Sequence, residues 1–234
     1  RLLKREEVAE GTMAFHFEKP AGFSFRPGQA AEIILTDVAG NDQSNSQHAF
    51  SIVSAPSQNE LVFATRMRDS AFKNTLKSLA IGSFVDLDGP FGSLTLHNDR
   101  NRPAVLIAGG IGITPFVSIL RHACELRLPH RLVLLYSNRR PEDAAFLAEL
   151  QDLAKQNDNF QLVATMTQMS GSRLAWQGKT TLMDEALIKS AADGLSSAIY
   201  YLVGPPGMVE AMRQTLHRIG VDDDDIRTEE FYGY

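Results

Sequence analysis

Cysteine is almost absent from this chain of 234 residues, where Cys124 stands alone. One thiol cannot form an internal disulfide, and by itself it cannot hold an iron–sulfur cluster or a structural zinc ion. The six histidines show no spacing typical of metal ligands, so no metal site is expected. We expect Cys124 to lie in a helix over 116–126 as core or half-buried packing.

Long apolar runs are also missing. The longest, residues 104–120, is interrupted by glycines, a threonine and a proline, whereas a membrane-spanning helix needs about 20 largely apolar residues. The first residues, Arg-Leu-Leu-Lys-Arg, lack the apolar core of a signal peptide. The expected location is therefore the cytoplasm, with no membrane span.

The chain has no long basic run, and 23 Lys and Arg stand against 28 Asp and Glu, for a net charge of −5. Nucleic acid and anionic membranes are therefore poor default partners. Gly-x-Ser-x-Gly, His-Glu-x-x-His and Cys-x-x-Cys do not occur, so hydrolase, metalloprotease and dithiol chemistry lack support.

What is present divides into two halves. Up to about residue 100, short alternating segments are separated by turn residues, which predicts a small antiparallel barrel of the six-stranded type. One helix is expected over 70–79, because its apolar residues recur at helical spacing. The predicted strands cover 12–17, 31–35, 50–53, 61–65 and 84–87.

From about residue 103 the pattern changes to alternating strands and helices. Continuous apolar strands with intervening helices are typical of a Rossmann-like parallel sheet covered on both faces. We therefore predict two domains, 1–100 and 101–234, with the boundary near 98–102. The predicted strands cover 104–108, 132–136, 161–164 and 199–203, and helices are expected to begin near Thr114, Pro141, Thr181 and Pro206.

A glycine-rich turn, residues 109–115, directly follows the first predicted parallel strand. Gly110 and Gly112 would let the backbone approach a phosphate closely. Thr114 is a natural N-cap and Pro115 suits the first helical position, which leaves free amide donors at the positive end of a helix. The turn thus predicts a dinucleotide or phosphate site, and a tight turn without a ligand is the alternative.

Two further turns follow predicted parallel strands. Ser137 precedes Arg139 and Arg140, and no acidic residue is there to bind a ribose diol, so the arginines favour a 2′-phosphate or are solvated loop charges. Gly204 and Pro205 end the fourth strand. Because the carboxyl ends of parallel strands line one crevice, this turn is expected near the glycine-rich turn, or is only a loop before a helix.

In the first half, strand alternation predicts His48, Phe50 and Ile52 on one face of a strand and Ala49, Ser51 and Val53 on the other. Such a strand offers an aromatic surface and a hydroxyl to a bound ring. By itself it also fits an ordinary core strand.

Six short motifs in order carry a resemblance to a known family. They are Arg-Pro-Gly-Gln at 26–29, His-Ala-Phe-Ser at 48–51, Gly-Pro-Phe-Gly at 89–92, the turn at 109–115, Gly204-Pro205 and Glu-Glu-Phe at 229–231. In this order the chain resembles the ferredoxin-NADP reductase family over nearly its whole length. The resemblance implies a flavin-binding barrel joined to a nicotinamide-nucleotide domain, with FAD as the flavin and FMN as the alternative.

The resemblance also implies site residues. Phe50 would pack on the flavin and Ser51 would bond near its N5, while Glu229 and Phe231 would lie beside the nicotinamide and over the flavin ring. His48 stands where the family usually has Arg, so we expect Lys73 or Arg66 to supply the missing charge. The catalytic residues implied are Ser51, Glu229 and Phe231. The cofactor-binding residues expected are His48, Ala49, Phe50, Ser51, Ile52, Val53, Ala64, Thr65, Arg66, Ser70, Ala71, Phe72, Lys73, Gly110, Gly112, Thr114, Pro115, Ser137, Arg139, Arg140, Gly204, Pro205 and Phe231.

The implied activity is hydride transfer from NADPH or NADH to the flavin, followed by electron transfer to a separate acceptor. Arg139 and Arg140 favour NADPH, with Arg173 as a further candidate for its phosphate. The acceptor would be ferredoxin, flavodoxin, another redox protein or a small molecule. The main alternative is a flavin-poor subunit that senses nucleotide or transfers electrons within a larger complex. A dehydrogenase acting directly on an alcohol is disfavoured by the barrel half.

Overall fold

The computed structural model describes residues 1–35 and 46–232. Its backbone contacts separate two compact units, Arg1–Thr95 with Thr114–His122, and Leu96–Ile113 with Ala123–Tyr234. The chain first passes from the first unit to the second between Thr95 and Leu96, close to the boundary expected near 98–102. The start of the helix after the glycine-rich turn groups with the first unit, and the domain ranges 1–100 and 101–234 remain a prediction.

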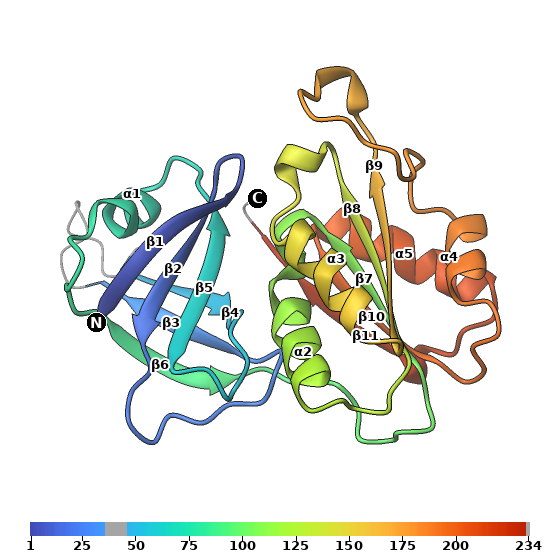
Figure 1. Ribbon diagram of the computed structural model, residues 1–234, viewed down its shortest axis with the longest axis horizontal. Coiled ribbons are helices and arrows are strands. Elements are labelled where there is room, and N and C mark those ends of the chain that lie inside the picture. Colours follow the sequence, from blue (N-terminus) through green and yellow to red (C-terminus); the bar gives the residue numbers. More distant parts are fainter. Residues whose placement is uncertain (36–45, 233–234) are drawn as a thin grey trace. The chain divides into compact units, whose positions relative to one another are not determined.

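The first unit contains two three-stranded antiparallel sheets and one helix of its own (Figure 1). The sheet orders are β1-β2-β5 and β4-β3-β6, and an antiparallel bridge between Ile52 and Phe63 joins the end of β4 to β5. The predicted six-stranded antiparallel architecture is confirmed. Its elements are β1 Leu2–Ala9, β2 Thr12–Glu18, β3 Ala30–Ile34, β4 Gln47–Ser51, β5 Glu60–Arg66, α1 Ala71–Ser78 and β6 Asp86–Phe91.

An aromatic core holds this unit together. Phe17 and Phe63 meet edge to face with ring centroids 6.1 Å apart, and Phe15 is fully buried beside them in the same cluster. Helix α1 adds Phe72 and Leu76, which are four residues apart and so share one face. The hydroxyl of Ser70 accepts a hydrogen bond from the backbone N–H of Lys73, which fixes where the helix begins.

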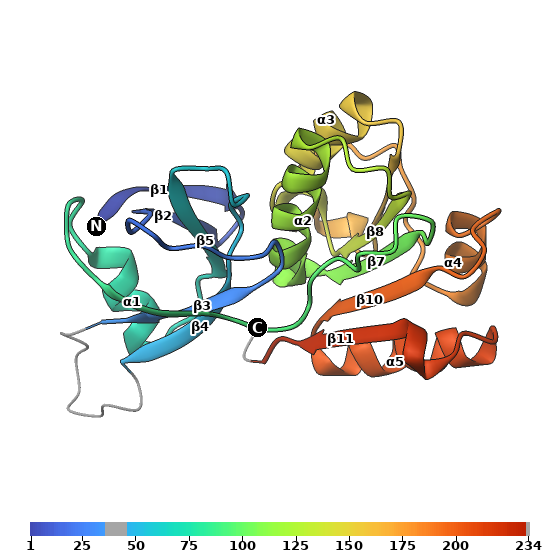
Figure 2. The ribbon, with the colours of Figure 1, turned by 90° about the horizontal axis from the view of Figure 1, so that it is seen from below.

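The second unit is a five-stranded parallel sheet in the order β11-β10-β7-β8-β9. Figure 2 shows α3 and α5 on opposite sides of this sheet, as the predicted Rossmann-like layers require. Its strands are β7 Ala104–Gly109, β8 Leu132–Asn138, β9 Phe160–Met166, β10 Ile199–Gly204 and β11 Ile226–Glu230. Its helices are α3 Leu147–Gln156, α4 Glu185–Ala191 and α5 Pro206–Arg218, and its 3-10 turns are η2 Gly110–Ile113, η3 Pro141–Asp143, η4 Met169–Gly171 and η5 Asp223–Asp225. Helix α2 Thr114–Glu125 follows η2, and its residues up to His122 group with the first unit.

Several predicted element boundaries were wrong. Strand β1 was missed, because the charged residues of Leu2–Ala9 hide the alternation that its pairing with β2 reveals. Strand β4 begins and ends earlier than predicted, and β6 later. The helix expected at Pro141 is only the turn η3, since Phe146 adopts a left-handed backbone before α3 begins. The helix expected near Thr181 begins at Glu185, where Asp184 caps it.

The segment that opens the second unit is anchored by a buried histidine pair. The backbone N–H of His97 donates to the Tyr201 hydroxyl at 3.0 Å, and His97 Nδ1 lies 2.9 Å from the same oxygen. The Nε2 atoms of His97 and His130 lie 2.9 and 3.1 Å from the carbonyl oxygens of Arg102 and His97. Because carbonyls only accept, each ring donates through Nε2 and fits the neutral form.

Among the described residues, no helix has the length and apolar character that crossing a bilayer requires.

Acid should weaken this anchor. Burial lowers the pKa of His97 and of His130, because it disfavours the charged imidazolium. A lowered folded-state pKa gives stability that is present above the unfolded value of about 6.5 and is lost as the pH falls toward the folded value. We expect the free energy of unfolding, measured by urea denaturation, to fall between about pH 8 and about pH 5.5.

The variant His130→Gln should show a smaller fall over the same interval. The control His217→Gln changes an exposed histidine paired with Asp223 and should behave like wild type. An equal fall in wild type and His130→Gln would contradict the assignment.

Candidate functional site

In the first unit, the strand expected to hold a flavin has its aromatic face as predicted. His48 lies edge to face with Phe72 at a centroid distance of 4.5 Å, and Phe50 lies 6.0 Å from the same ring. Phe50 is only 7% exposed and belongs to the core cluster, whereas His48 and Ala49 are exposed overall. The three rings therefore form one aromatic cluster from β4 to α1, in which His48 is the exposed member.

Ser51 ends β4 with an unsatisfied hydroxyl. The residue is 4% exposed, and its Oγ has no hydrogen-bond partner in the described part of the chain. A buried hydroxyl left without a partner costs roughly 1–3 kcal/mol, so such a group is a candidate for binding a ligand. The position is the one predicted to bond near the flavin N5.

Lys73 is the cation beside His48. Burial and then Lys73 lower the pKa of His48, so this histidine is not a permanent positive charge like the arginine it replaces. The Lys73 ammonium donates to the carbonyl of Arg66 at 2.9 Å, and burial and then Arg68 lower its own pKa. The structure thus brings together His48, Lys73 and the end of β5, as the compensation hypothesis requires.

Most of the other residues expected around a flavin lie in the interior of the first unit. Ala64 and Thr65 are buried in β5, and Ile52 is buried in the core cluster. The carbonyl of Val53 accepts a hydrogen bond from Arg121 of α2 at 3.1 Å. Ala71 is exposed at the first position of α1.

In the second unit, the glycine-rich turn depends on close backbone packing. A Cβ on Gly112 would lie 2.6 Å from the carbonyl oxygen of Val203 and 2.9 Å from Cα of Gly204. Gly110 has φ +55 with open space around it, a conformation that glycine adopts at little cost. The turn is therefore pressed against the end of β10, which places two of the predicted motifs together.

The expected cap at Thr114 was wrong. The helical backbone begins earlier, as the 3-10 turn η2 that leads directly into α2, so Thr114 is the first α-helical residue and not an N-cap. Thr114 and Pro115 are both buried. The first backbone N–H groups of this combined helix therefore belong to η2 and not to the first turn of α2.

The end of the chain joins the same cluster. The backbone N–H of Phe231 donates to the carbonyl of Gly204 at 2.9 Å, and Glu229 pairs with Val203 in the parallel register of β10 and β11. Both side chains are half-buried, and Pro205 is exposed. Three separate predicted motifs therefore meet at the carboxyl ends of β7, β10 and β11.

The two arginines after β8 differ from each other. Arg140 binds both carboxylate oxygens of Asp143, with its Nε 3.0 Å and its Nη2 2.8 Å from them. Arg139 is exposed and makes no ion pair with another described residue. Ser137 is half-buried and pairs in register with Gly109. Arg139 is thus the arginine of this pair whose charge is available to a phosphate.

The sequence analysis did not single out two residues near the end of β8, Asn138 and Glu142. Asn138 is buried at the end of β8, and its Nδ2 has no partner among the residues described. Glu142 accepts hydrogen bonds from the Ser172 hydroxyl and from the backbone N–H groups of Arg173 and Leu174. An amide directly after an apolar strand was a usable signal for Asn138, but nothing in the sequence connected Glu142 to a loop thirty residues away.

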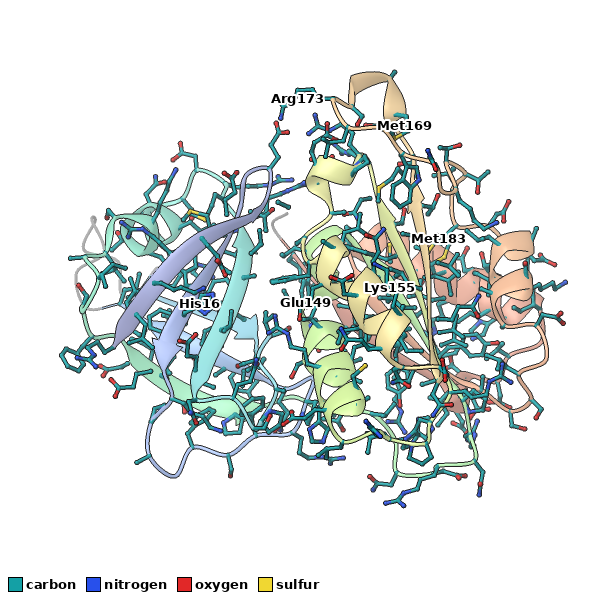
Figure 3. All side chains as sticks on the ribbon, in the orientation of Figure 1. His16, Glu149, Lys155, Met169, Arg173 and Met183 are labelled. Atoms are coloured by element: carbon teal, nitrogen blue, oxygen red, sulfur yellow. The ribbon has the colours of Figure 1, made fainter. Side chains whose placement is uncertain are left out.

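The Glu142 interaction fixes the loop after β9. Desolvation opposes ionisation of Glu142. Hydrogen bonds from the backbone N–H of Glu142, from Arg173, from Ser172 and from Leu174 outweigh it and hold the pKa of Glu142 at about 2. Figure 3 shows Met169 and Arg173 on this loop beyond the end of β9. The Arg173 side chain is exposed there, and its backbone N–H donates a hydrogen bond to the Glu142 carboxylate.

Residues 106–214 match the family described as "Oxidoreductase NAD-binding domain". Among similar solved structures are a cytochrome P450 reductase from Amycolatopsis and a ferredoxin NADP+ reductase from Neisseria gonorrhoeae with bound FAD and NADP. The first has a TM-score of 0.80 and 23% identity, covering 98% of this chain and 68% of that one. The second has a TM-score of 0.79 and 23% identity, covering 98% and 96%. These likenesses bear out the predicted resemblance to the ferredoxin-NADP reductase family at the level of the fold.

Curated relatives of this chain are described as components of oxygenase systems. The reductase component of propane 2-monooxygenase from Rhodococcus jostii is 27% identical, over 91% of this chain and 57% of the relative. The toluate 1,2-dioxygenase electron transfer component from Pseudomonas putida is 29% identical, over 96% of this chain and 65% of the relative. The chain spans about three fifths of the length of these relatives.

The close approach at Gly112 gives a direct test of the nucleotide turn. We expect Gly112→Ala to lower the free energy of unfolding by roughly 1–3 kcal/mol, because its methyl group would overlap the backbone of β10. Binding of a nicotinamide nucleotide, measured by calorimetry, should weaken as the turn is displaced.

The matched control is Gly207→Ala in the first turn of α5, where a Cβ meets nothing within 4 Å. It should change the free energy of unfolding by no more than about 0.5 kcal/mol. Equal effects of the two substitutions would show that the turn is not held as described.

Proposed function

We propose that this chain is an NAD(P)H-dependent flavoprotein reductase that passes a hydride from the nicotinamide nucleotide to bound FAD, and then electrons to a separate acceptor. The convergence of the glycine-rich turn, the Gly204 turn and Phe231 in the second unit carries this proposal. The relatives described as reductase or electron transfer components of oxygenases support it.

The first unit has groups that fit a flavin. The unsatisfied hydroxyl of Ser51 would gain a hydrogen-bond partner, and His48 and Phe50, whose ring centroids lie 6.3 Å apart, would offer aromatic contact to a ring system. Lys73 and the N-terminus of α1 would bind a pyrophosphate, which makes FAD the expected flavin and FMN the alternative.

The flavin, when bound, supplies the hydride and electron chemistry, and the chain supplies position and environment. The Ser51 hydroxyl would hold the ring edge in one orientation. In the second unit, backbone N–H groups of η2 would bind the nucleotide phosphates and Glu229 would lie beside the nicotinamide, while Phe231 is the aromatic residue expected to cover the flavin ring. Ser51, Glu229 and Phe231 are therefore the residues proposed to position the reacting groups.

The acceptor is proposed to be a separate redox protein, such as ferredoxin, flavodoxin or an oxygenase component, or a small molecule. The net charge of −5 gives no overall attraction to an acidic partner, so recognition would depend on a local surface. A cytoplasmic location remains the expectation.

A second candidate follows from His48. A neutral histidine in place of a permanent cation favours weaker flavin binding, and a flavin-poor subunit would bind nucleotide without reducing anything. The two functions differ in whether the purified protein catalyses oxidation of NADH or NADPH.

Turnover with an artificial acceptor tests the proposed function. The purified chain, supplied with FAD, should reduce ferricyanide at the expense of NADH or NADPH. Ser51→Ala should lower kcat by about tenfold, because one hydrogen bond that orients the flavin is lost.

The control Ser57→Ala changes an exposed serine and should leave kcat unchanged. Nucleotide binding without any reduction of ferricyanide would reject the reductase and favour the flavin-poor subunit.

Lys73 should determine flavin retention. Because one charge-assisted hydrogen bond to phosphate is removed, Lys73→Ala should raise the Kd for FAD by about tenfold or more, measured by fluorescence titration of the apoprotein. Lys77→Ala, which changes an exposed lysine on the same helix, should leave the Kd unchanged. Identical affinities in Lys73→Ala and wild type would remove Lys73 from the flavin site.

Coenzyme choice should depend on Arg139 and not on Arg140. Arg139→Ala should lower kcat/KM for NADPH by about tenfold and leave NADH nearly unaffected, because only NADPH carries the 2′-phosphate. Arg140→Ala breaks the pair with Asp143 and should affect both coenzymes alike. If Arg139→Ala changes both coenzymes equally, the residue does not contact the 2′-phosphate.

A further inference from the structure

The second unit contains an open groove along the outer edge of its sheet. Its volume is about 600 Å³, within the range of small-molecule sites. The groove is lined by Gln151 and Lys155 of α3, by residues 162–164 of β9, and by Trp176, Gly178 and Lys179. We call it the Trp176 groove.

The groove exists because β9 is the last strand of the sheet and is only partly covered. Beyond β9, Thr165 forms a parallel bridge with Lys179, and the backbone N–H of Met166 donates to the Lys179 carbonyl at 2.9 Å. That contact covers the carboxyl end of the strand. Residues 162–164 come before it and are half-buried. Because strand side chains alternate, Leu162 and Ala164 share one face and give the groove an apolar floor, while Val163 packs against the core on the other face.

One wall of the groove is held in place before any ligand binds. The indole Nε1–H of Trp176 donates to the carbonyl of Lys179 at 2.8 Å. The backbone of Gly178 lies against the ring so closely that a Cβ there would come within 2.5 Å of it. A fixed aromatic wall beside an apolar floor favours a flat, apolar ligand.

The charge at the groove has one sign. Lys155 and Lys179 are its ionisable lining residues, and no carboxylate lines it. Lys155, labelled beside α3 in Figure 3, shares its charge with Asp152, whose Oδ1 lies 2.8 Å from its Nζ. Lys179 makes no ion pair with another residue that the structure describes. A ligand with an anionic group would therefore gain a charge-assisted hydrogen bond.

We propose that the Trp176 groove binds a flat aromatic carboxylate, with its ring against the indole and the β9 residues Leu162 and Ala164, and its carboxylate at Lys179 and Lys155. The site lies along the β9 edge, and β8 separates β9 from β7, whose end carries the glycine-rich turn. It is therefore a separate site from the one proposed for the nicotinamide nucleotide.

Trp176 is the sole tryptophan of the chain, so the protein has a single indole N–H and this signal reports directly on the groove. We would titrate the ¹⁵N-labelled chain with benzoate and follow the indole N–H by NMR. The signal should shift in a saturable manner. Benzyl alcohol, which has the ring without the charge, should bind about tenfold more weakly.

Two variants test the wall and the charge. Lys179→Met keeps the carbonyl that holds Trp176 and should weaken benzoate about tenfold. Lys155→Met should also weaken it, whereas Lys189→Met on α4, outside the groove, should not. Gly178→Ala should displace the indole, shift its signal without ligand and weaken benzoate.

The proposal would be overturned by an indole signal that benzoate leaves unchanged, or by benzoate affinity that is equal in wild type, Lys179→Met and Lys155→Met. Displacement of benzoate by AMP at similar concentration would also overturn it, because the groove would then belong to the nucleotide site.

Discussion

The backbone contact between Gly112 and the end of β10 organises the second unit. Because residue 112 has no side chain, the turn after β7 lies directly against Val203 and Gly204. The carbonyl of Gly204 in turn accepts the hydrogen bond from Phe231. Three segments far apart in the sequence are thereby fixed at the carboxyl ends of the parallel strands, which is where parallel sheets bind ligands. The proposed nucleotide site depends on this contact.

In the first unit, the proposed flavin site would have to bind an anionic cofactor without an arginine at position 48. His48 is exposed overall, yet partial burial of its ring favours the neutral form, and its contact with Phe72 makes it part of an aromatic cluster. Lys73 lies on the adjoining helix, with its ammonium on the Arg66 carbonyl. In the proposed flavin site, His48 and Phe50 would contact the ring, Lys73 would supply positive charge for the phosphate, and Ser51 would orient the ring edge.

Residue patterns predicted the layers and the turns well, because apolar periodicity and glycine placement are local properties. The alternation around His48 and the strands of the parallel sheet are examples. Partner choice among side chains is not local. Arg139 and Arg140 look equivalent in the sequence, and only the fold shows that Asp143 binds one of them. The same holds for Glu142, whose partners Ser172 to Leu174 are brought near by the end of β9.

The most direct test of the account is an anaerobic stopped-flow experiment on the purified chain with FAD bound and one equivalent of NADH or NADPH. The account predicts that the visible flavin absorbance bleaches in a single turnover. A chain that binds the nucleotide while its flavin stays oxidised, or that binds no flavin at all, would contradict it.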